Sequence, residues 1–269
     1  HGALGAFAFG IGATEMAAVW ALGSILNVEV PATIKVVATG RFAEGVYPKD
    51  LVLWLVGKLT AEGANFKVIE FHGEAVREMP TSGRLVLCNM TVEAGATGGV
   101  IPPDAETERY LREEAGVTEK IDRVLPDADA VYERIVEIDV SKLEPQIACP
   151  HTVDNVRPAA ELSDVHIDQV FVGTCTNGRI EDIGLVARML AGRKKASGTR
   201  LLVAPASRSI LLQAIEKGYI STLVEFGAMI LPPGCAACLG LHQGVLGDGE
   251  LEVADLLRGH GARGGDERP

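Results

Sequence analysis

Aromatic side chains are scarce in this sequence of 269 residues, where they make up only 5% of the total and include two Trp. Hydrophobic residues nevertheless reach 47%, so we expect a core built from Val, Ile, Leu and Ala. The 31 glycines and the alternation of strand-like and helix-like segments favour an α/β protein with tight turns. A chain of this length can bury a large core and form more than one domain.

Basic residues are also in short supply. The 25 Lys and Arg face 36 Asp and Glu, which gives a formal net charge of −11 at pH 7. No stripe of basic residues offsets this charge, and binding to nucleic acid or to an anionic membrane needs one. The composition therefore argues against both kinds of partner and is typical of a cytoplasmic protein surface.

Cysteines and long apolar runs are limited as well. The five cysteines are unevenly spaced, which does not fit the disulfide framework of a secreted domain and favours a reducing compartment. The apolar N-terminal stretch is interrupted by Glu15 and is rich in glycine, so we do not expect it to span a membrane. No charged segment precedes it, as a signal peptide would require, and the first residue is His rather than Met, so the native start is expected to be missing.

Two short stretches organise the rest of the chain. The first runs from Val170 to Asp182 and contains Cys175, and the second contains a Cys-x-x-Cys pair at positions 235 and 238. In each, a short apolar run that predicts a buried strand meets a glycine and a cysteine, and strand ends are where α/β folds gather their chemistry. Cys175 precedes the amphipathic stretch 180–190, so its sulfur is expected near a helix N-terminus that favours a thiolate.

Three thiolates delivered by two strand ends suit a soft metal site. A structural zinc site and an ordinary iron–sulfur cluster each take four protein ligands, so a cluster held by three would leave one iron open as a Lewis acid. The residues alone leave other interpretations open. A lone Cys-x-x-Cys is as often a redox pair or a chance pair of small buried residues, and the same thiols could bind zinc in a non-catalytic scaffold.

Four motifs, in order along the chain, carry a resemblance to a known family. The segment 173–182, Gly-Thr-Cys-Thr-Asn-Gly-Arg-Ile-Glu-Asp, and the segment 234–240, Gly-Cys-Ala-Ala-Cys-Leu-Gly, resemble the two cluster motifs of the aconitase superfamily. Segments 1–12 and 87–96 are similar to further parts of it, and the similarity runs to about residue 250. Within the superfamily the chain most resembles the large subunits of the 3-isopropylmalate dehydratase family, with the homoaconitase large subunits a close second.

The resemblance implies an aconitase-like, multi-lobed fold of α/β/α layers and a hydro-lyase that isomerises a 2-hydroxy acid by removing and re-adding water. It implies that Cys175, Cys235 and Cys238 hold a 4Fe-4S cluster, with the substrate at the open iron. The implied reaction converts 2-isopropylmalate into 3-isopropylmalate in leucine biosynthesis, and the alternative is a homoaconitase-type reaction on homocitrate.

The same resemblance implies roles for three further residues. Glu93 is the predicted catalytic residue, which exchanges a proton with the leaving water, and Asn89 and Asn177 are predicted to bind substrate oxygens. Asn89 and Glu93 are one helical turn apart, so both can face one cavity. The base that removes the carbon-bound proton is a Ser on a separate small subunit in the family, so a heteromeric partner is implied. From the residues alone, Glu93 would rather be a solvated helix residue.

Other polar positions have both a structural and a functional interpretation. Cys88 does not match a cluster position and is predicted to be a small core residue, and His72 follows a predicted strand and is expected to be structural. Ser207 lies at a strand-to-helix turn, where it could bind an anion or cap the helix, and a cap is favoured. Arg179 is a candidate for structural pairing or for anion contact, with no basis for choosing.

We expect three lobes and a tail. Residues 1–32 would be the remnant of an N-terminal lobe, 33–143 a middle α/β lobe, and 144–250 a lobe that carries the cluster cysteines. Residues 251–269 are rich in Arg and Gly and are predicted to be disordered. Family motifs expected before residue 1 (Asp-Ser-His-Thr) and after residue 250 (Asn-Arg-Asn-Phe type) are absent, which leaves an inactive, truncated scaffold as an alternative. Strands are predicted in the middle lobe at 33–39, 67–71, 84–87 and 134–140.

Overall fold

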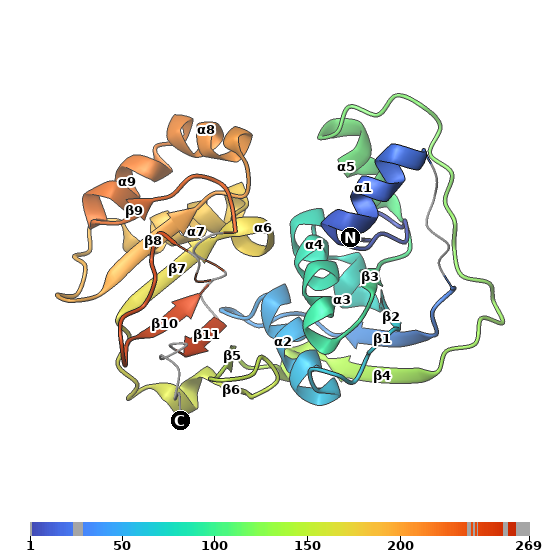
Figure 1. Ribbon diagram of the computed structural model, residues 1–269, viewed down its shortest axis with the longest axis horizontal. Coiled ribbons are helices and arrows are strands. Elements are labelled where there is room, and N and C mark those ends of the chain that lie inside the picture. The colour runs from blue at the N-terminus through green and yellow to red at the C-terminus, as the bar shows by residue number, and fades with distance from the viewer. Residues whose placement is uncertain are drawn as a thin grey trace. The chain divides into compact units, whose positions relative to one another are not determined.

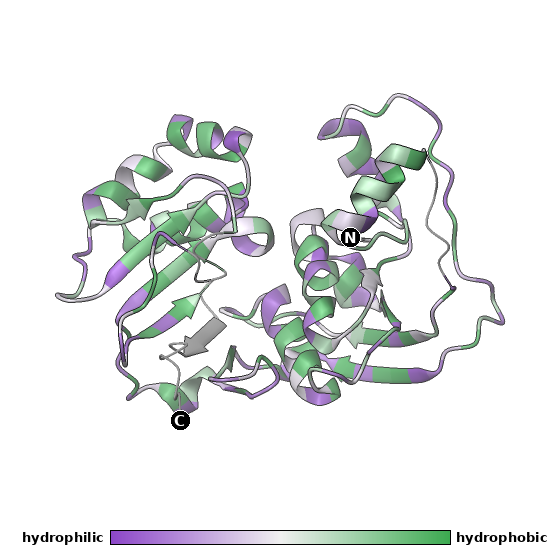
Figure 2. Cartoon of the chain, in the orientation of Figure 1, coloured by the Kyte–Doolittle hydropathy of each residue, from purple (hydrophilic) through white to green (hydrophobic). Residues whose placement is uncertain are grey.

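The computed structural model describes residues 2–23, 29–235, 238, 240, 242–254 and 258–261, the last of these by their backbone only. The chain divides into two compact units, His1–Leu143 and Glu144–Pro269, each a mixture of strands and helices (Figure 1). Hydrophobic residues dominate the central strands of both units (Figure 2). No helix among the described residues is both long enough and apolar enough to cross a membrane.

The first unit is built on a four-stranded parallel sheet. Its strands are β1 (Thr33–Thr39), β2 (Val68–His72), β3 (Gly98–Val100) and β4 (Arg134–Asp139), in the order β3-β2-β1-β4. Along β1 the apolar side chains of Ile34, Val36 and Ala38 are buried, and the residues between them are partly exposed. This alternation is the period-2 pattern of a strand with one face against a core.

Helices cover the buried face of this sheet. They are α2 (Pro48–Leu59), α3 (Glu74–Arg77), α4 (Thr81–Met90) and the 3-10 helix η1 (Thr91–Ala94); α1 (Ala13–Leu22) and α5 (Ala105–Glu113) belong to the same unit. The strand predicted at 84–87 is therefore wrong, because these residues lie in α4. A short buried apolar run fits a helix or a strand equally well by pattern alone. Tertiary contacts decide here: Glu106 of α5 accepts hydrogen bonds from the Thr81 amide (2.8 Å) and hydroxyl (2.9 Å), which satisfies a free N–H at the start of α4.

The N-terminal segment joins the same sheet. The Gly2 amide donates to the Gly99 carbonyl (3.0 Å), and the Ile101 amide donates to the Gly2 carbonyl (3.0 Å). A Cβ atom at Gly2 would lie 2.4 Å from the Gly99 oxygen, so only glycine permits this approach. We expected residues 1–32 to be the remnant of a separate lobe. In the structure they belong to the same compact unit as the middle lobe.

The second unit contains a seven-stranded sheet in the order β6-β5-β11-β10-β7-β8-β9. The strands are β5 (Gln146–Ala148), β6 (Val156–Pro158), β7 (Gln169–Gly173), β8 (Arg200–Ala204), β9 (Met229–Ile230), β10 (Leu251–Ala254) and β11 (Arg258–Gly261). Strands β10, β7, β8 and β9 run parallel to one another. Their C-terminal ends therefore lie along one edge of the sheet.

Short helices connect and cover these strands. They are α6 (Thr174–Asn177), α7 (Ile180–Leu190), α8 (Arg208–Glu216) and α9 (Tyr219–Phe226); η2 (Val140–Lys142) and η3 (Ala159–Leu162) lie in the connections. On one face of β7 and β8, Val172 and Val203 pack with Ile183 of α7 and Leu223 of α9. On the other face, Phe171 and Leu202 form a second buried cluster with three further residues, Ala204, Leu231 and Ala254.

The prediction that the chain is disordered from residue 251 is wrong for residues 251–254. They form β10, in which Val253 pairs with Val170 of β7 and Glu252 accepts a hydrogen bond from Gln169 Nε2 (2.6 Å). The Arg and Gly content of the residues that follow predicted disorder for the whole tail. Residues 251–254 nevertheless alternate as a strand does, and Ala254 is buried. Residues 255–257 and 262–269 lie outside the described part of the chain.

An ion pair between the buried Arg84 and the partly exposed Asp104 holds α4 in place. The Arg84 side chain is only 1% exposed, and its guanidinium binds both carboxylate oxygens of Asp104 (2.7 and 2.8 Å) and the carbonyls of Met79 and Arg77 (3.0 Å each). Burial raises the pKa of Asp104, but the hydrogen bonds from Arg84 and from the Thr107 amide outweigh it and hold that pKa below its usual value. Because α4 carries Asn89, this pair also positions a predicted site residue.

We expect Asp104→Asn to destabilise the protein by about 3 kcal/mol, because it leaves a buried guanidinium without its charge partner. Asparagine keeps a side-chain oxygen for the cap of α5, so the variant tests charge pairing alone. Urea unfolding followed by circular dichroism measures the change. The matched control is Glu78→Gln, which breaks the exposed Arg41–Glu78 pair (3.3 Å) and should stay within about 0.5 kcal/mol of the parent. Equal effects of the two substitutions would contradict the assignment.

Candidate functional site

The turn that follows β7 is forced by close backbone contact with β8. Gly173 has φ +138°, and a Cβ atom there would lie 1.9 Å from the Ala204 carbonyl oxygen. The next residue, Thr174, has φ +64°, a left-handed conformation that costs a non-glycine residue about 1–2 kcal/mol. Such strain collects at functional sites, where the surrounding structure holds it in place.

This turn presents Cys175. The residue is the second of α6 and is exposed. Gly178 closes the turn against the end of β8, where its carbonyl accepts from the Ala206 amide (2.9 Å) and a Cβ atom would lie 2.7 Å from that nitrogen. The sulfur therefore stands on a rigid loop at the C-terminal edge of the parallel strands, as predicted from the sequence.

Asn177 lies in the same turn and is fixed by the start of α7. Asp182 accepts hydrogen bonds from Asn177 Nδ2 (3.2 Å) and from the Arg179 amide (3.0 Å). A carboxylate in the first turn of a helix satisfies free N–H groups and favours the helix dipole. Of the predicted site residues, Cys175 and Asn177 are thus brought together on one four-residue helix.

Three buried polar atoms of segment 174–179, which contains Cys175, have no hydrogen-bond partner within the described structure: Thr174 Oγ1, Asn177 Oδ1 and Arg179 Nε. Buried polar groups are satisfied in the great majority of cases, and each exception costs about 1–3 kcal/mol and calls for an explanation. A hydroxyl, an amide oxygen and a guanidinium N–H within six residues can together bind a polar, anionic ligand. Thr174 was not predicted from the sequence, and its left-handed backbone becomes visible only in the fold.

The second cysteine stretch leaves the sheet at the same edge. The Leu231 amide donates to the Val203 carbonyl (2.8 Å), which continues the pairing of β9 with β8. Cys235 is exposed, and Cys238 is half-buried against the cluster that contains Phe171 and Leu202. Residues 236, 237, 239 and 241 lie outside the described part of the chain.

The structure does not assemble the three thiols into a metal site within the residues it describes, where no three His, Cys, Asp or Glu side chains are gathered closely enough to hold a metal ion. No disulfide joins the five cysteines, all of which belong to the described part. The cluster ligand set of Cys175, Cys235 and Cys238 therefore stays a prediction.

Asn89 and Glu93 belong to the first unit. Asn89 lies in the last turn of α4 and Glu93 in η1, and both are half-buried. Their segment is pinned by two glycines: a Cβ atom at Gly95 would lie 2.0 Å from Asn65 Oδ1, and one at Gly99 would lie 2.8 Å from the Cα of Cys88. The two residues lie in consecutive helical segments, and their assignment to substrate binding and catalysis remains a prediction.

Comparison with known proteins identifies the family. The family model described as "Aconitase family (aconitate hydratase)" matches residues 1–163 and 152–267. The two matches together cover nearly the whole chain. The chain belongs to the aconitase family. This confirms the predicted family, and the parallel sheets with their covering helices are consistent with its α/β fold.

Individual relatives in the aconitase family are close in sequence. The chain is 49% identical to 3-isopropylmalate dehydratase large subunit 1 of Methanopyrus kandleri, over 98% of the chain and 63% of that relative. It is 45% identical to the probable methanogen homoaconitase large subunit of Methanosarcina mazei, over 99% of the chain and 67% of that relative. It is 44% identical to 3-isopropylmalate dehydratase large subunit 1 of Thermotoga maritima, over 98% of the chain and 63% of that relative. The chain thus spans about 63% of the length of relatives such as the first.

Three polar residues outside the predicted site have structural contacts, as predicted. Cys88 is fully buried, and burial raises the pKa of its thiol to about 12, so it stays neutral. Ser207 caps α8, where its hydroxyl accepts from the Ile210 amide (3.2 Å). His72 Nε2 lies 2.5 Å from Glu70 Oε1, which also accepts from the Tyr132 hydroxyl (3.2 Å).

Thiol labelling should separate the cysteines by exposure. At pH 8, a thiol with a pKa of about 12 is ionised in roughly one molecule in ten thousand, so Cys88 should resist iodoacetamide in the folded protein. Cys175 and Cys235 are exposed and should react first. Peptide mass spectrometry of short labelling pulses measures the order, and labelling in urea, where all five should react, is the control. Labelling of Cys88 as fast as Cys175 in the folded state would contradict the structure.

Proposed function

We propose that this chain is the cluster-bearing part of a hydro-lyase large subunit that interconverts 2-isopropylmalate and 3-isopropylmalate by dehydration and rehydration. The observation that carries the proposal is the exposed Cys175 on its strained turn, in a chain 49% identical to a 3-isopropylmalate dehydratase large subunit. The same turn holds three buried polar atoms that have no hydrogen-bond partner among the described residues. Because the chain spans about 63% of that relative, the proposal concerns the activity of the complete protein.

The proposed cofactor is a 4Fe-4S cluster held by Cys175, Cys235 and Cys238. The donor set supports it: Cys175 and Cys235 are exposed, and they follow β7 and β9, the two parallel strands on either side of β8. With three thiolate ligands, a bound cluster would supply one Lewis-acidic iron to the substrate. A reducing cytoplasmic compartment, which we also propose, would keep these thiols out of disulfides.

The chain's own side chains would bind the substrate and move one proton. Asn177 Oδ1, which is buried and has no partner among the described residues, can accept a hydrogen bond from a substrate hydroxyl. Arg179 Nε, likewise unpartnered, can donate to a substrate carboxylate, as guanidinium groups do well. Asn89 would hold a further oxygen. Glu93 would give a proton to the departing hydroxyl group, so that water leaves, and take it back on rehydration.

The second proton of the dehydration needs a base from elsewhere. Removing water takes a hydroxyl group from one carbon and a proton from its neighbour, and Glu93 serves only the first. The relatives are named large subunits, which supports a small-subunit partner, and we propose that this partner supplies the base as a Ser.

A homoaconitase-type reaction on homocitrate is the second candidate. It is favoured by relatives named as probable methanogen homoaconitase large subunits, at 45% and 42% identity. Assaying the complete large subunit with its small subunit against both substrates distinguishes the two reactions.

Cysteine variants test the cluster ligands. After anaerobic reconstitution with iron and sulfide, the parent chain should bind both and absorb visible light. Cys175→Ser should lose most of the iron and the absorbance, because a thiolate ligand is missing. The matched control is Cys88→Ala, which removes a buried thiol and should leave cluster content unchanged. Full iron content in Cys175→Ser would refute the ligand set, and one zinc per chain without sulfide would favour a zinc-binding scaffold.

Glu93 is tested in the complete enzyme. Glu93→Gln should lower kcat by about 10²- to 10⁴-fold, the usual contribution of a general acid–base residue, with iron content unchanged. The control Glu113→Gln changes an exposed carboxylate of α5 and should retain parent activity. A kcat within twofold of the parent in Glu93→Gln would show that Glu93 does not transfer the proton.

A further inference from the structure

The side chain of Gln169 joins three segments that are far apart in the sequence. Gln169 is the first residue of β7 and is fully buried. Its Nε2 donates to the Gly244 carbonyl (2.7 Å) and to Glu252 Oε1 of β10 (2.6 Å), and its Oε1 accepts from Arg200 Nε of β8 (2.7 Å). Both donors and the acceptor of the amide are therefore used. A buried amide bonded in this way holds its neighbours in one arrangement, because breaking any of the bonds leaves a buried polar group without a partner.

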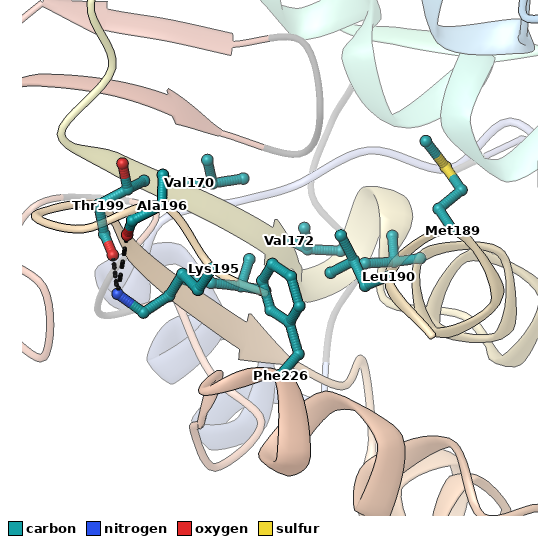
Figure 3. Close-up of a pocket in the computed structure, with 10 residues that line it drawn as sticks. Val170, Val172, Met189, Leu190, Lys195, Ala196, Thr199 and Phe226 are labelled. Atoms are coloured by element: carbon teal, nitrogen blue, oxygen red, sulfur yellow. Dashed lines mark hydrogen bonds between the residues drawn. The ribbon is translucent and has the colours of Figure 1, made fainter. Parts of the chain in front are cut away.

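Gln169 lies on the same face of β7 as Phe171. Successive side chains of a strand point to opposite faces of the sheet, and Figure 3 shows Val170 and Val172 at an apolar pocket on the face that α7 and α9 cover. Gln169 and Phe171 therefore point to the other face, where Phe171 belongs to the second buried cluster. Cys238 packs against this cluster, so one member of the Cys-x-x-Cys pair lies on the face to which Gln169 points.

Gly244 is held against the same face of the sheet. It has φ +114°, and a Cβ atom there would lie 2.2 Å from Leu202 Cδ1 and 3.1 Å from Gln169 Nε2. Only glycine permits both this conformation and this approach. The hydrogen bond from Gln169 therefore fixes the backbone at Gly244 directly.

The Cys-x-x-Cys pair comes between two fixed points of the chain. Before the pair, the Leu231 amide donates to the Val203 carbonyl (2.8 Å) at the end of β8. After the pair, the Gly244 carbonyl accepts from Gln169 (2.7 Å). A segment fixed on both sides has fewer conformations to lose when its residues bind a common ligand.

The strand that follows, β10, has anchors of its own. Asp168 Oδ2 accepts from the Leu251 amide (2.9 Å), and the Arg200 guanidinium binds both carboxylate oxygens of Glu250 (3.1 and 2.5 Å). Backbone pairing with β7 adds to these contacts. Loss of the Gln169 side chain should therefore release mainly the stretch that precedes β10.

We propose that Gln169 is a positioning residue for the ligands of the proposed cluster. By holding the Gly244 carbonyl, it ties the stretch that contains the Cys-x-x-Cys pair to β7. The same strand ends at the turn that carries Cys175, so all three predicted ligands are placed from one strand. Gln169 acts through the backbone and does not touch the cofactor. The inference rests on the proposed function, because the ligand set is part of that proposal.

Thiol labelling of the chain without a cluster tests this role. Gln169→Met keeps the length of the side chain and removes its hydrogen bonds. Labelling of the half-buried Cys238 by iodoacetamide should become about fivefold faster, the effect of one lost hydrogen bond on a local opening, and labelling of Cys175 should stay within about twofold. The matched control is Gln146→Met, which changes a buried glutamine of β5 that donates to the Glu144 carbonyl (2.8 Å). It should leave the Cys238 rate within about twofold.

Reconstitution with iron and sulfide gives a second readout. Gln169→Met should release iron to a chelator about fivefold faster than the parent chain and should change the visible circular dichroism of the bound cluster. Gln146→Met should match the parent in both measurements. A contribution of Gln169 to overall stability alone would make the two glutamine variants behave alike.

Gly244→Ala tests the same contact from its other side and leaves Gln169 in place. The added methyl group does not fit beside Leu202, so Cys238 labelling should again become faster. This variant decides the matter if Gln169→Met fails to fold, which far-ultraviolet circular dichroism detects. An unchanged Cys238 rate in the folded variants, or an equal increase in Gln146→Met, would overturn the role of Gln169. A parent chain that binds no iron and sulfide would instead refute the proposed cluster.

Discussion

The close approach of two backbones at the ends of β7 and β8 is the constraint on which the candidate site depends. Gly173 and Gly178 lie against Ala204 and Ala206 at distances that no Cβ atom could tolerate. Because the chain must turn within this narrow space, Thr174 takes a left-handed conformation and Cys175 is directed out of the sheet edge. The exposure of the thiol is thus a consequence of packing between two neighbouring strands, and it does not require any contact of the sulfur itself.

The same constraint leaves the site energetically incomplete. A left-handed threonine, and three buried polar atoms that have no partner in the part of the chain that the structure describes, each cost on the order of 1 kcal/mol or more. Bonds within α7, and those that Asp182 accepts from Asn177 and the Arg179 amide, keep the turn folded despite this cost. A ligand that satisfied these atoms would bind the folded chain and not the unfolded one, so binding would also stabilise the protein. The turn therefore has the energetics of a preformed binding site.

The sequence predicted the sheet-forming strands well where the pattern was unambiguous. The alternation of 33–39 predicted β1. The two short apolar runs that lead to Gly173 and to Gly234 predicted β7 and β9. The prediction failed at 84–87, because a buried apolar run fits a helix or a strand and the contact of Glu106 with Thr81 favours the helix. It also failed at 251–254, because the composition of the tail predicted disorder in spite of a short strand-like alternation. The unpartnered atoms of Thr174 and Arg179 could not be predicted, because they arise from contacts between segments about 30 residues apart. Motif similarity predicted the family, since four spaced motifs carry more information than any one of them.

In both units, glycines in close backbone contact fix the segments that carry the predicted site residues. In the first, Gly95 and Gly99 let the Asn89–Glu93 segment lie directly on Asn65 and on β3; in the second, Gly173 and Gly178 let the Cys175 turn lie on β8. In each case a glycine removes the side chain that would otherwise separate a strand from a functional segment. Positions held by backbone contact cannot shift by small rotamer changes, as positions held by side chains can. This rigidity suits the proposed site, which would hold a substrate in one orientation during the reaction.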